Sequence, residues 1–179
     1  MKAQLRPFLR PGLDVLFVAL NPPAQSNSNG HYFSGARSRF FKLLALSGLT
    51  THELPKNHAD ELVFGSTKFN YSGAAFGVID LVEDLVETNS GRVRAKRHHV
   101  EKLLSRIHEF EPRFVCVIHS KVRDALQRYG NLLGPLDYGC CGKVIPESAT
   151  GLLVNYFPNG NSIPDGPKLQ IFRDLRDLL

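Results

Sequence analysis

The sequence predicts an α/β protein: a three-layer α/β/α sandwich around a central, largely parallel four-stranded sheet. Short apolar runs alternate along the chain with segments whose apolar residues recur at helical spacing, which is typical of parallel sheets. The first run, Leu13–Leu20, is apolar on both faces, as a strand covered by helices on both sides must be. With 179 residues, 42% of them hydrophobic, the chain can build the core of a single domain spanning residues 1–179.

Four runs are expected to form the strands. Each is short, and the second is partly β-branched, which favours extended backbone. The ranges are Leu13–Leu20, Phe114–Ile118, Gly142–Ile145 and Leu152–Tyr156.

Helices are expected where apolar residues repeat every three or four positions. In Arg37–Ser47, Phe40, Leu43 and Leu44 share one face, and Gly48 ends the helix. The other expected helices are His58–Phe64, His99–Phe110, Val122–Tyr129 and Pro167–Leu179. Lys68–Gly77 is rich in Gly, Ser and Asn and is expected to be a loop, while Val78–Val86 is apolar but interrupted by acidic residues.

Composition limits the classes of function. The net charge of +5 and the pI of about 9.2 permit a polyanionic partner without requiring one. Three cysteines, with Cys140 and Cys141 adjacent, make neither a disulfide framework nor a four-thiolate cluster site, so we expect a reducing cytoplasm. We find no secretory leader and no run near the roughly 20 apolar residues that span a bilayer. His98-His99 is not metal-ligand spacing, and we expect neither metal nor cofactor.

Two loops are expected to line one cleft. The first strand stops at Asn21-Pro22-Pro23, and the last is followed by the Pro- and Gly-containing turn Phe157–Ser162. Ligand clefts of open α/β sheets lie outside the carboxyl ends of their strands. The sequence therefore predicts a site walled by the turn at Asn21 and the turn around Gly160.

An ordered set of motifs resembles the uracil-DNA glycosylase superfamily, most closely its mismatch-specific uracil/thymine-DNA glycosylase branch. That branch has a strand ending in Gly-Ile-Asn-Pro-Gly, an aromatic residue, a basic helix start, a Gly-Ile-Thr-Asp-Leu-Val segment, a Leu-Gly-Lys after a buried strand and a final Asn-Pro-Ser-Gly-Leu-Ser motif. The matching segments here are Ala19–Pro23, Phe33, Ser38–Lys42, Gly77–Val82, His119–Lys121 and Phe157–Ser162. The order is kept from about Leu13 to the final helix.

The chain departs from the branch at several positions. Ala19 and Pro23 replace glycines of the first motif, and Phe157, Asn159 and Asn161 replace Asn, Ser and the apolar wedge of the last. These departures leave the reaction class in place and leave the preferred base open: uracil, hypoxanthine, xanthine or mismatched thymine.

The resemblance implies catalytic roles for Asn21 and Asp80. Asn21 would hold the attacking water with its amide oxygen; alternatively, it merely ends a strand and caps a turn. Asp80 would activate water or stabilise the sugar cation, because an unpaired carboxylate in an apolar run is costly. The alternative for Asp80 is a helix N-cap, with Glu83 completing a capping box.

Other residues are assigned to base and DNA binding through the same resemblance. Ala19, Leu20, Phe33 and Ser34 would form the base pocket, with the Phe33 ring stacked on the base or, alternatively, part of the core. The expected DNA contacts are Lys121, Pro158, Asn159, Gly160, Asn161 and Ser162. The loop Pro158–Ser162 would insert into DNA, or is a plain Asn-Gly turn. A basic cluster at Arg92–His99 is either a solvated helix start or a further DNA contact.

The leading hypothesis is a monofunctional DNA glycosylase of base-excision repair. It would flip uracil or a related base out of DNA and hydrolyse its glycosidic bond as a monomer. A non-catalytic nucleic-acid-binding module on the same scaffold is the alternative. A nucleotide or nucleoside enzyme is a third hypothesis, weakened by the lack of a Gly-rich phosphate loop.

Overall fold

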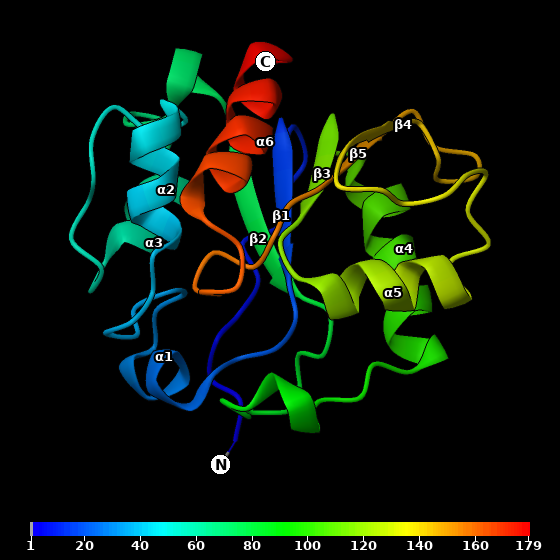
Figure 1. Cartoon of the computed structure of the whole chain (residues 1–179), viewed down its shortest axis with the longest axis horizontal. Helices are drawn as coiled ribbons and strands as arrows, with labels where there is room; N and C mark the ends of the chain where they lie inside the picture. Colours follow the sequence, from blue (N-terminus) through cyan, green and yellow to red (C-terminus); the bar gives the residue numbers. More distant parts are fainter. Residues whose placement is uncertain (1) are drawn as a thin grey trace.

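A computed structural model describes residues 2–179 (Figure 1). Its centre is one sheet with the strand order β2-β1-β3-β5-β4, in which only β4 runs antiparallel to its neighbour. The strands are β1 (Val15–Ala19), β2 (Phe76–Asp80), β3 (Phe114–Val117), β4 (Gly139–Gly142) and β5 (Gly151–Val154). The predicted fold class, an α/β protein with a largely parallel central sheet, is confirmed.

Helices cover both faces of the sheet (Figure 1). On one face lie α2 (Phe40–Ser47), α3 (Ala59–Phe64) and α6 (Asp165–Asp177); on the other lie α4 (Arg97–Phe110) and α5 (Ser120–Tyr129). Two apolar cores result, because alternate strand residues point to opposite faces. Phe17 packs with Phe40 and Phe172 in one core, and Val18 lies with Val100 and Leu126 in the other.

The sheet has five strands rather than four. The additional strand, β2, spans the end of the expected loop Lys68–Gly77 and the start of the apolar segment Val78–Val86. Gly77 belongs to this strand for a steric reason. A Cβ there would lie 2.4 Å from the carbonyl oxygen of Phe8 and 2.6 Å from Leu13. Glycine in the run therefore marks a close approach of the N-terminal segment, not a loop.

Several element boundaries differ from expectation. The polar loop after Asn21 contains a short helix, α1 (Ala24–Asn29), and 3-10 turns occur at Tyr71–Gly73 (η1) and Ser90–Arg92 (η2). Helix α2 begins at Phe40 rather than Arg37, and β4 ends at Gly142, where a strand was expected to begin. The alternation of strands and helices is unaffected.

The parallel strands place four polar or aromatic segments at one edge of the sheet. Asp80 ends β2, Asn21 follows β1, His119 follows β3 and the Phe157 turn follows β5. This carboxyl edge is the lower end of the sheet in Figure 1. The turns at Asn21 and Gly160 thus lie at the same end of the molecule, as the cleft hypothesis requires.

Candidate active site at the carboxyl edge of the sheet

Strand pairing fixes the relation between the two candidate catalytic residues. Asp80 is in register with Ala19, and the amides of Leu81 and Val82 donate to the carbonyl oxygens of Ala19 (2.9 Å) and Leu20 (2.8 Å). Asn21 lies two residues beyond the end of the neighbouring strand β1. The structure therefore brings Asp80 and Asn21 together at the ends of two adjacent parallel strands.

Asp80 is buried without a full set of partners. The residue is only 3% exposed, and its Oδ2 atom has no hydrogen-bond partner among residues 2–179. Burial raises the pKa of this carboxyl group to about 8, although a hydrogen bond with Tyr32 opposes the shift. A buried carboxyl group with an unused oxygen is an expensive feature that a binding or catalytic role would explain.

The alternative interpretation of Asp80 as a helix N-cap is wrong. Asp80 is the last residue of β2, and no helix begins in the segment that follows it. The next two amides donate to the carbonyl oxygens of Ala19 and Leu20, so there is no free helix N-terminus for the carboxylate to cap. Glu83 instead pairs with Lys102 of α4.

Tyr32 is a site residue whose importance the sequence does not reveal. It is 3% exposed, and its hydroxyl is hydrogen-bonded to Asp80. Burial, and next the charge of Asp80, raise the pKa of Tyr32 far above its ordinary value, so the hydroxyl keeps its proton. Its backbone amide donates to Asp60 Oδ2 at 2.8 Å, which fixes the chain beside the site. No sequence spacing links Tyr32 to Asp80; only the fold does.

The side chain of Asn21 is held in one orientation. Its Nδ2 atom donates to the carbonyl oxygens of Glu87 (2.8 Å), Leu85 (3.2 Å) and Pro22 (3.2 Å). These bonds tie the end of β1 to the segment after β2. Within residues 2–179 nothing donates to the amide oxygen of Asn21, so this atom is free to accept a hydrogen bond from water.

Phe33 is half-buried and sits in a strained backbone conformation. Its φ angle is 55°, a region that non-glycine residues rarely adopt. Its ring stacks on Phe40 at 4.0 Å between centroids and meets Phe41 edge-on. Ser34 follows, and its hydroxyl donates to the His31 carbonyl oxygen at 2.8 Å. Phe33 thus combines core packing on one side with partial exposure, which leaves room for the predicted stacking role.

His119 and Lys121 lie after β3 in the sequence, at the start of α5. The Lys121 amide donates to His119 Nδ1 (3.1 Å), and burial together with Lys121 lowers the pKa of His119 to about 4. The imidazole is therefore neutral and carries its proton on Nε2. The ammonium group of Lys121 donates to the carbonyl oxygens of Ser90 and Val93, so in this state it is engaged within the protein.

The turn Phe157–Ser162 is anchored from both sides. Lys168 of α6 is 1% exposed and donates through Nζ to the carbonyl oxygens of Gly160 (2.6 Å) and Pro158 (3.2 Å). The Oδ1 atom of Asn159 accepts from the backbone amide of Arg39 at 2.8 Å. Phe157 is 43% exposed beside the His119 ring, at 5.0 Å between centroids. The turn is therefore held rigidly while it presents an aromatic ring and two polar side chains, Asn161 and Ser162, to solvent.

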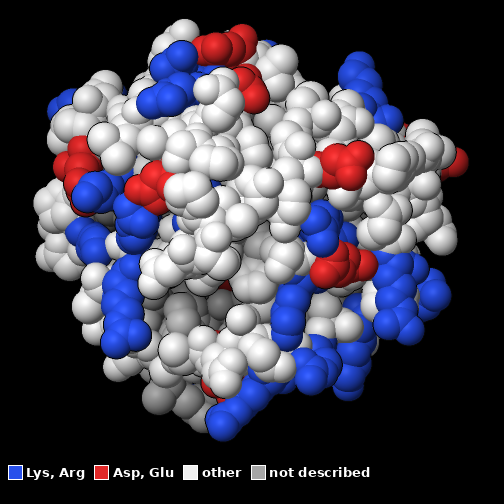
Figure 2. Space-filling view, in the orientation of Figure 1, with Lys and Arg blue, Asp and Glu red and all other residues white. Residues whose placement is uncertain are grey.

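Basic side chains surround this edge. Figure 2 shows a hollow in the lower half of the face, with Lys and Arg side chains on both sides of it. The expected basic cluster lies on η2 and the start of α4, where Arg92, Arg94, Lys96 and Arg97 are exposed. Arg94 donates to the Gly91 carbonyl oxygen, and Arg97 lies over the Tyr129 ring.

Taken together, the fold and this edge define an α/β protein with a polar, partly buried site outside its parallel strands, framed by positive charge. Comparison with known families then identifies the group. The chain belongs to the Uracil DNA glycosylase superfamily, whose family model matches residues 6–169. This membership implies hydrolysis of an N-glycosidic bond in damaged DNA, and therefore DNA as the substrate.

Two further observations concern other classes of site. Among residues 2–179, no group of three or more His, Cys, Asp or Glu side chains is arranged to hold a metal ion. No helix in the same range is both long enough and apolar enough to cross a membrane.

Proposed function

We propose that this protein is a monofunctional DNA glycosylase of base-excision repair that removes uracil, or a related deaminated or mismatched base, and leaves an abasic site. The observation that carries the proposal is the pair formed by Asp80, buried with an unpartnered oxygen, and the oriented amide of Asn21 beside it. From the order of its motifs we infer that the chain is nearest to the mismatch-specific branch of its superfamily. We expect a monomer that needs no metal or cofactor.

In this mechanism the target nucleotide leaves the base stack before the bond is broken. The base enters beside Phe33, whose ring provides a stacking surface worth about 1–3 kcal/mol. Backbone groups of Ala19, Leu20 and Ser34 surround the base. As the base departs with the bonding electrons, the sugar acquires positive charge at its anomeric carbon, and in this scheme the Asp80 carboxylate stabilises that charge.

Water completes the reaction in this scheme. The amide oxygen of Asn21 accepts a hydrogen bond from the water and holds it, and the carboxylate of Asp80 takes the proton as the water attacks the anomeric carbon. Because the pKa of Asp80 is about 8, most free enzyme at neutral pH carries a proton on this group. The cationic sugar favours its ionised form.

Water rather than an amine is inferred as the nucleophile. Lys121 and Lys168, which lie at this edge, hold their ammonium groups against backbone carbonyl oxygens. An amine whose hydrogen-bonding groups are engaged by backbone in this way is not positioned to attack the sugar.

A substrate panel tests the function. Oligonucleotides that contain uracil, hypoxanthine, xanthine or mispaired thymine are incubated with the protein, and alkali then cuts any abasic site. We expect cleavage at one or more of these bases. If the protein bound DNA in a salt-dependent way but cleaved none of these substrates, we would conclude that it is a non-catalytic nucleic-acid-binding module and not an enzyme.

Two variants test the assigned roles on the substrate that is cleaved. Asn21→Ala and Asp80→Ala should each reduce single-turnover cleavage by at least about 100-fold, because the first loses the positioning of the water and the second loses the proton acceptor. Thr88→Val is the control for Asn21. It removes the bond from the Ala24 amide to Thr88 Oγ1 (3.1 Å) and so loosens the same segment while leaving Asn21 in place. If Thr88→Val lost as much activity as Asn21→Ala, the role of Asn21 would be to hold this segment in place and not to position water.

A further inference from the structure

A second buried carboxylate contacts the same tyrosine as Asp80. Asp60 lies in the first turn of α3 and is only 2% exposed. Its Oδ2 atom accepts a hydrogen bond from the Tyr32 amide at 2.8 Å. Its Oδ1 atom accepts from the Glu61 amide and from Nδ1 of the His31 ring, both at 2.9 Å. Both oxygens of Asp60 are thus partnered, whereas Oδ2 of Asp80 has no partner among residues 2–179.

The three donors that converge on Asp60 require a carboxylate. An ionised carboxyl group only accepts hydrogen bonds, so Nδ1 of His31 carries the proton in this contact. An asparagine at position 60 would turn its amide nitrogen toward the amide of either Tyr32 or Glu61, and two donors would then face each other. The carboxylate therefore joins the loop at His31 and Tyr32 to the start of α3 in a way that its amide cannot reproduce.

The loop that Asp60 holds has an unusual backbone. Gly30 and Phe33 both adopt left-handed conformations, with φ angles of 77° and 55°. For a phenylalanine this conformation is costly, and it persists only where surrounding contacts fix it. The Ser34 hydroxyl donates to the His31 carbonyl oxygen at 2.8 Å and so closes the loop on itself. The bonds to Asp60 connect the closed loop to a different element of the fold.

Tyr32 is fixed at both ends as a result. Its amide is held by Asp60, its hydroxyl is hydrogen-bonded to Asp80, and its ring meets Phe8 edge-on at 6.3 Å between centroids. Phe33 is the next residue along the chain. A shift of the Tyr32 backbone would therefore displace the hydroxyl from Asp80 and move the Phe33 ring with it.

We propose that Asp60 is a positioning residue of the active site: with His31, it holds Tyr32 so that the tyrosine hydroxyl reaches Asp80 and the Phe33 ring borders the base pocket. Within residues 2–179 the side chain of Asp60 forms no hydrogen bond with Asp80, so it acts through Tyr32. The inference rests on the proposed function for what Asp80 and Phe33 do to the substrate. The hold on Tyr32 is a property of the folded protein alone.

This role has a consequence for the protonation of Asp80. Burial raises the pKa of Asp80 to about 8, the hydrogen bond with Tyr32 lowers it, and the charge of Glu83 raises it. Glu83 is itself paired with Lys102, and the charge of Asp60 acts on the pKa of Tyr32. Loss of the Tyr32 bond should therefore raise the pKa of Asp80 further. Removal of the negative charge of Asp60 alone should not raise it.

The test titrates Asp80 in the free protein through the ¹³C signal of its carboxyl group, assigned with Asp80→Asn, so that neither substrate nor cleavage is involved. Tyr32→Phe should raise the pKa of Asp80 by about one to two pH units, the equivalent of one hydrogen bond to a charged group. Asp60→Asn should raise it in the same direction. If Asp60→Asn did not fold, His31→Phe would decide in its place, because it removes one donor at a half-buried position and should give a smaller rise.

Asn70→Ala is the matched control. Asn70 is also buried, and it donates to the carbonyl oxygens of Val63 (2.9 Å) and Ala74 (2.8 Å), so it supports the other end of α3 without touching the Tyr32 loop. Its replacement should lower the melting temperature, as Asp60→Asn should, but leave the pKa of Asp80 unchanged. A pKa shift in Asp60→Asn that is absent from the control therefore reports positioning and not a general loss of stability.

An unchanged pKa of Asp80 in Asp60→Asn would make Asp60 a merely structural residue and overturn the proposal. No rise in Tyr32→Phe would also overturn it, because Tyr32 would then not act on Asp80. The titration and the assay for base release can fail separately. If the pKa rises as expected but the native protein releases no base, the positioning role stands and the glycosylase function does not. If base is released but the variants titrate like the native protein, the glycosylase function stands without this role.

Discussion

At the scale of single residues, Asp80 shows how the site costs stability. Its pKa rises from 3.8 to about 8 on folding, so between these values the folded protein holds a proton that the unfolded chain has released. The unfolded state is then favoured progressively as the pH rises from about 4 to 8, and the loss is constant above that range. A group retained at such a cost is expected where function needs it.

Asp80→Asn should therefore stabilise the protein. The amide keeps the shape of the carboxyl group but cannot ionise, so the gain should be absent near pH 4 and reach the order of a few kcal/mol at pH 8. Thermal unfolding would show it as a rise of about 2–4 °C per kcal/mol. Asp137→Asn, an exposed position, is the control and should change little. Equal melting curves for Asp80→Asn and the native protein at both pH values would contradict the buried, destabilising carboxyl group.

Single residues also show what the sequence can and cannot select as a candidate for the site. Asn21 and Asp80 could be selected because a polar side chain that interrupts or ends an apolar run has few structural explanations. Tyr32 and His119 could not be ranked, since their significance comes from contacts between distant segments: Tyr32 with Asp80, and His119 with Phe157. Such contacts have no periodic signature in the chain.

At the scale of elements, the turn after β5 depends on one buried cation. Lys168 reaches from α6 to the carbonyl oxygens of Pro158 and Gly160, and burial lowers the pKa of its ammonium group, which Asp165 counteracts. Hydrogen bonds from charged groups contribute about 1.5–3 kcal/mol each. This anchor holds the turn that presents Phe157 and Asn161 at the carboxyl edge of the sheet.

Lys168→Met should keep the buried stem of the side chain and remove only its donors. We expect a lower melting temperature and a several-fold loss of DNA affinity, because the turn is released and two carbonyl oxygens lose their partner. Lys143→Met is the control, an exposed lysine whose substitution removes the same charge. A variant that melts and binds DNA like this control would show that Lys168 does not hold the turn.

Helices and strands could be predicted from the sequence where the apolar residues followed one clear pattern, either helical or extended. Helix α4 and strand β1 have clear patterns, and both lie close to their expected ranges. Strand β2 was missed because Gly77 and Asp80 break its apolar run. The first is required by the close approach of Phe8 and Leu13, and the second belongs to the site. A close steric approach at Gly77 and a buried carboxyl group at Asp80 thus interrupt the apolar pattern of this strand.

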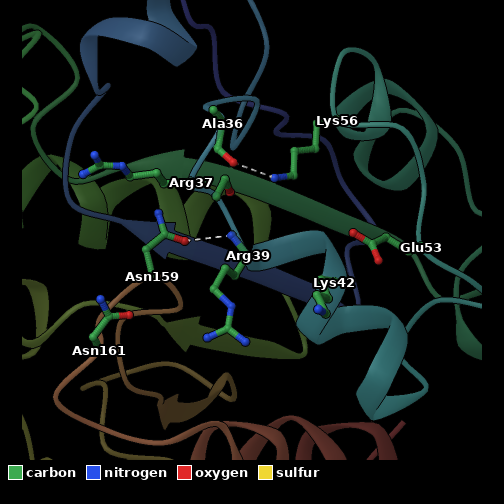
Figure 3. A pocket seen from close by; sticks show the side chains of 9 residues that line it. Ala36, Arg37, Arg39, Lys42, Glu53, Lys56, Asn159 and Asn161 are labelled. Atoms are coloured by element: carbon green, nitrogen blue, oxygen red, sulfur yellow. Dashed lines mark hydrogen bonds between the residues drawn. The ribbon is translucent and has the colours of Figure 1, made fainter.

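At the scale of the whole molecule, parallel strand order converts scattered motifs into one surface. Segments at Asn21, Asp80, His119 and Phe157 are far apart in sequence, and the order β2-β1-β3-β5 sets them side by side at one edge. Ordered motifs predicted this edge, but they could not predict how the start of α2 meets the turn after β5, where the Arg39 amide donates to Asn159 Oδ1 (Figure 3). No single segment encodes that contact.

The pH dependence of base release tests the central claim that Asp80 and Asn21 form a base-excising site. The measurement is kcat/KM for release of the free base from the preferred oligonucleotide between pH 5 and pH 10. Because the carboxylate is the active form and its pKa in the free enzyme is about 8, kcat/KM should rise with pH and level off above that value. Asp80→Asn should abolish the rise and leave only a small, flat rate. A native profile that is flat across this range, or a rise that persists in Asp80→Asn, would contradict the account.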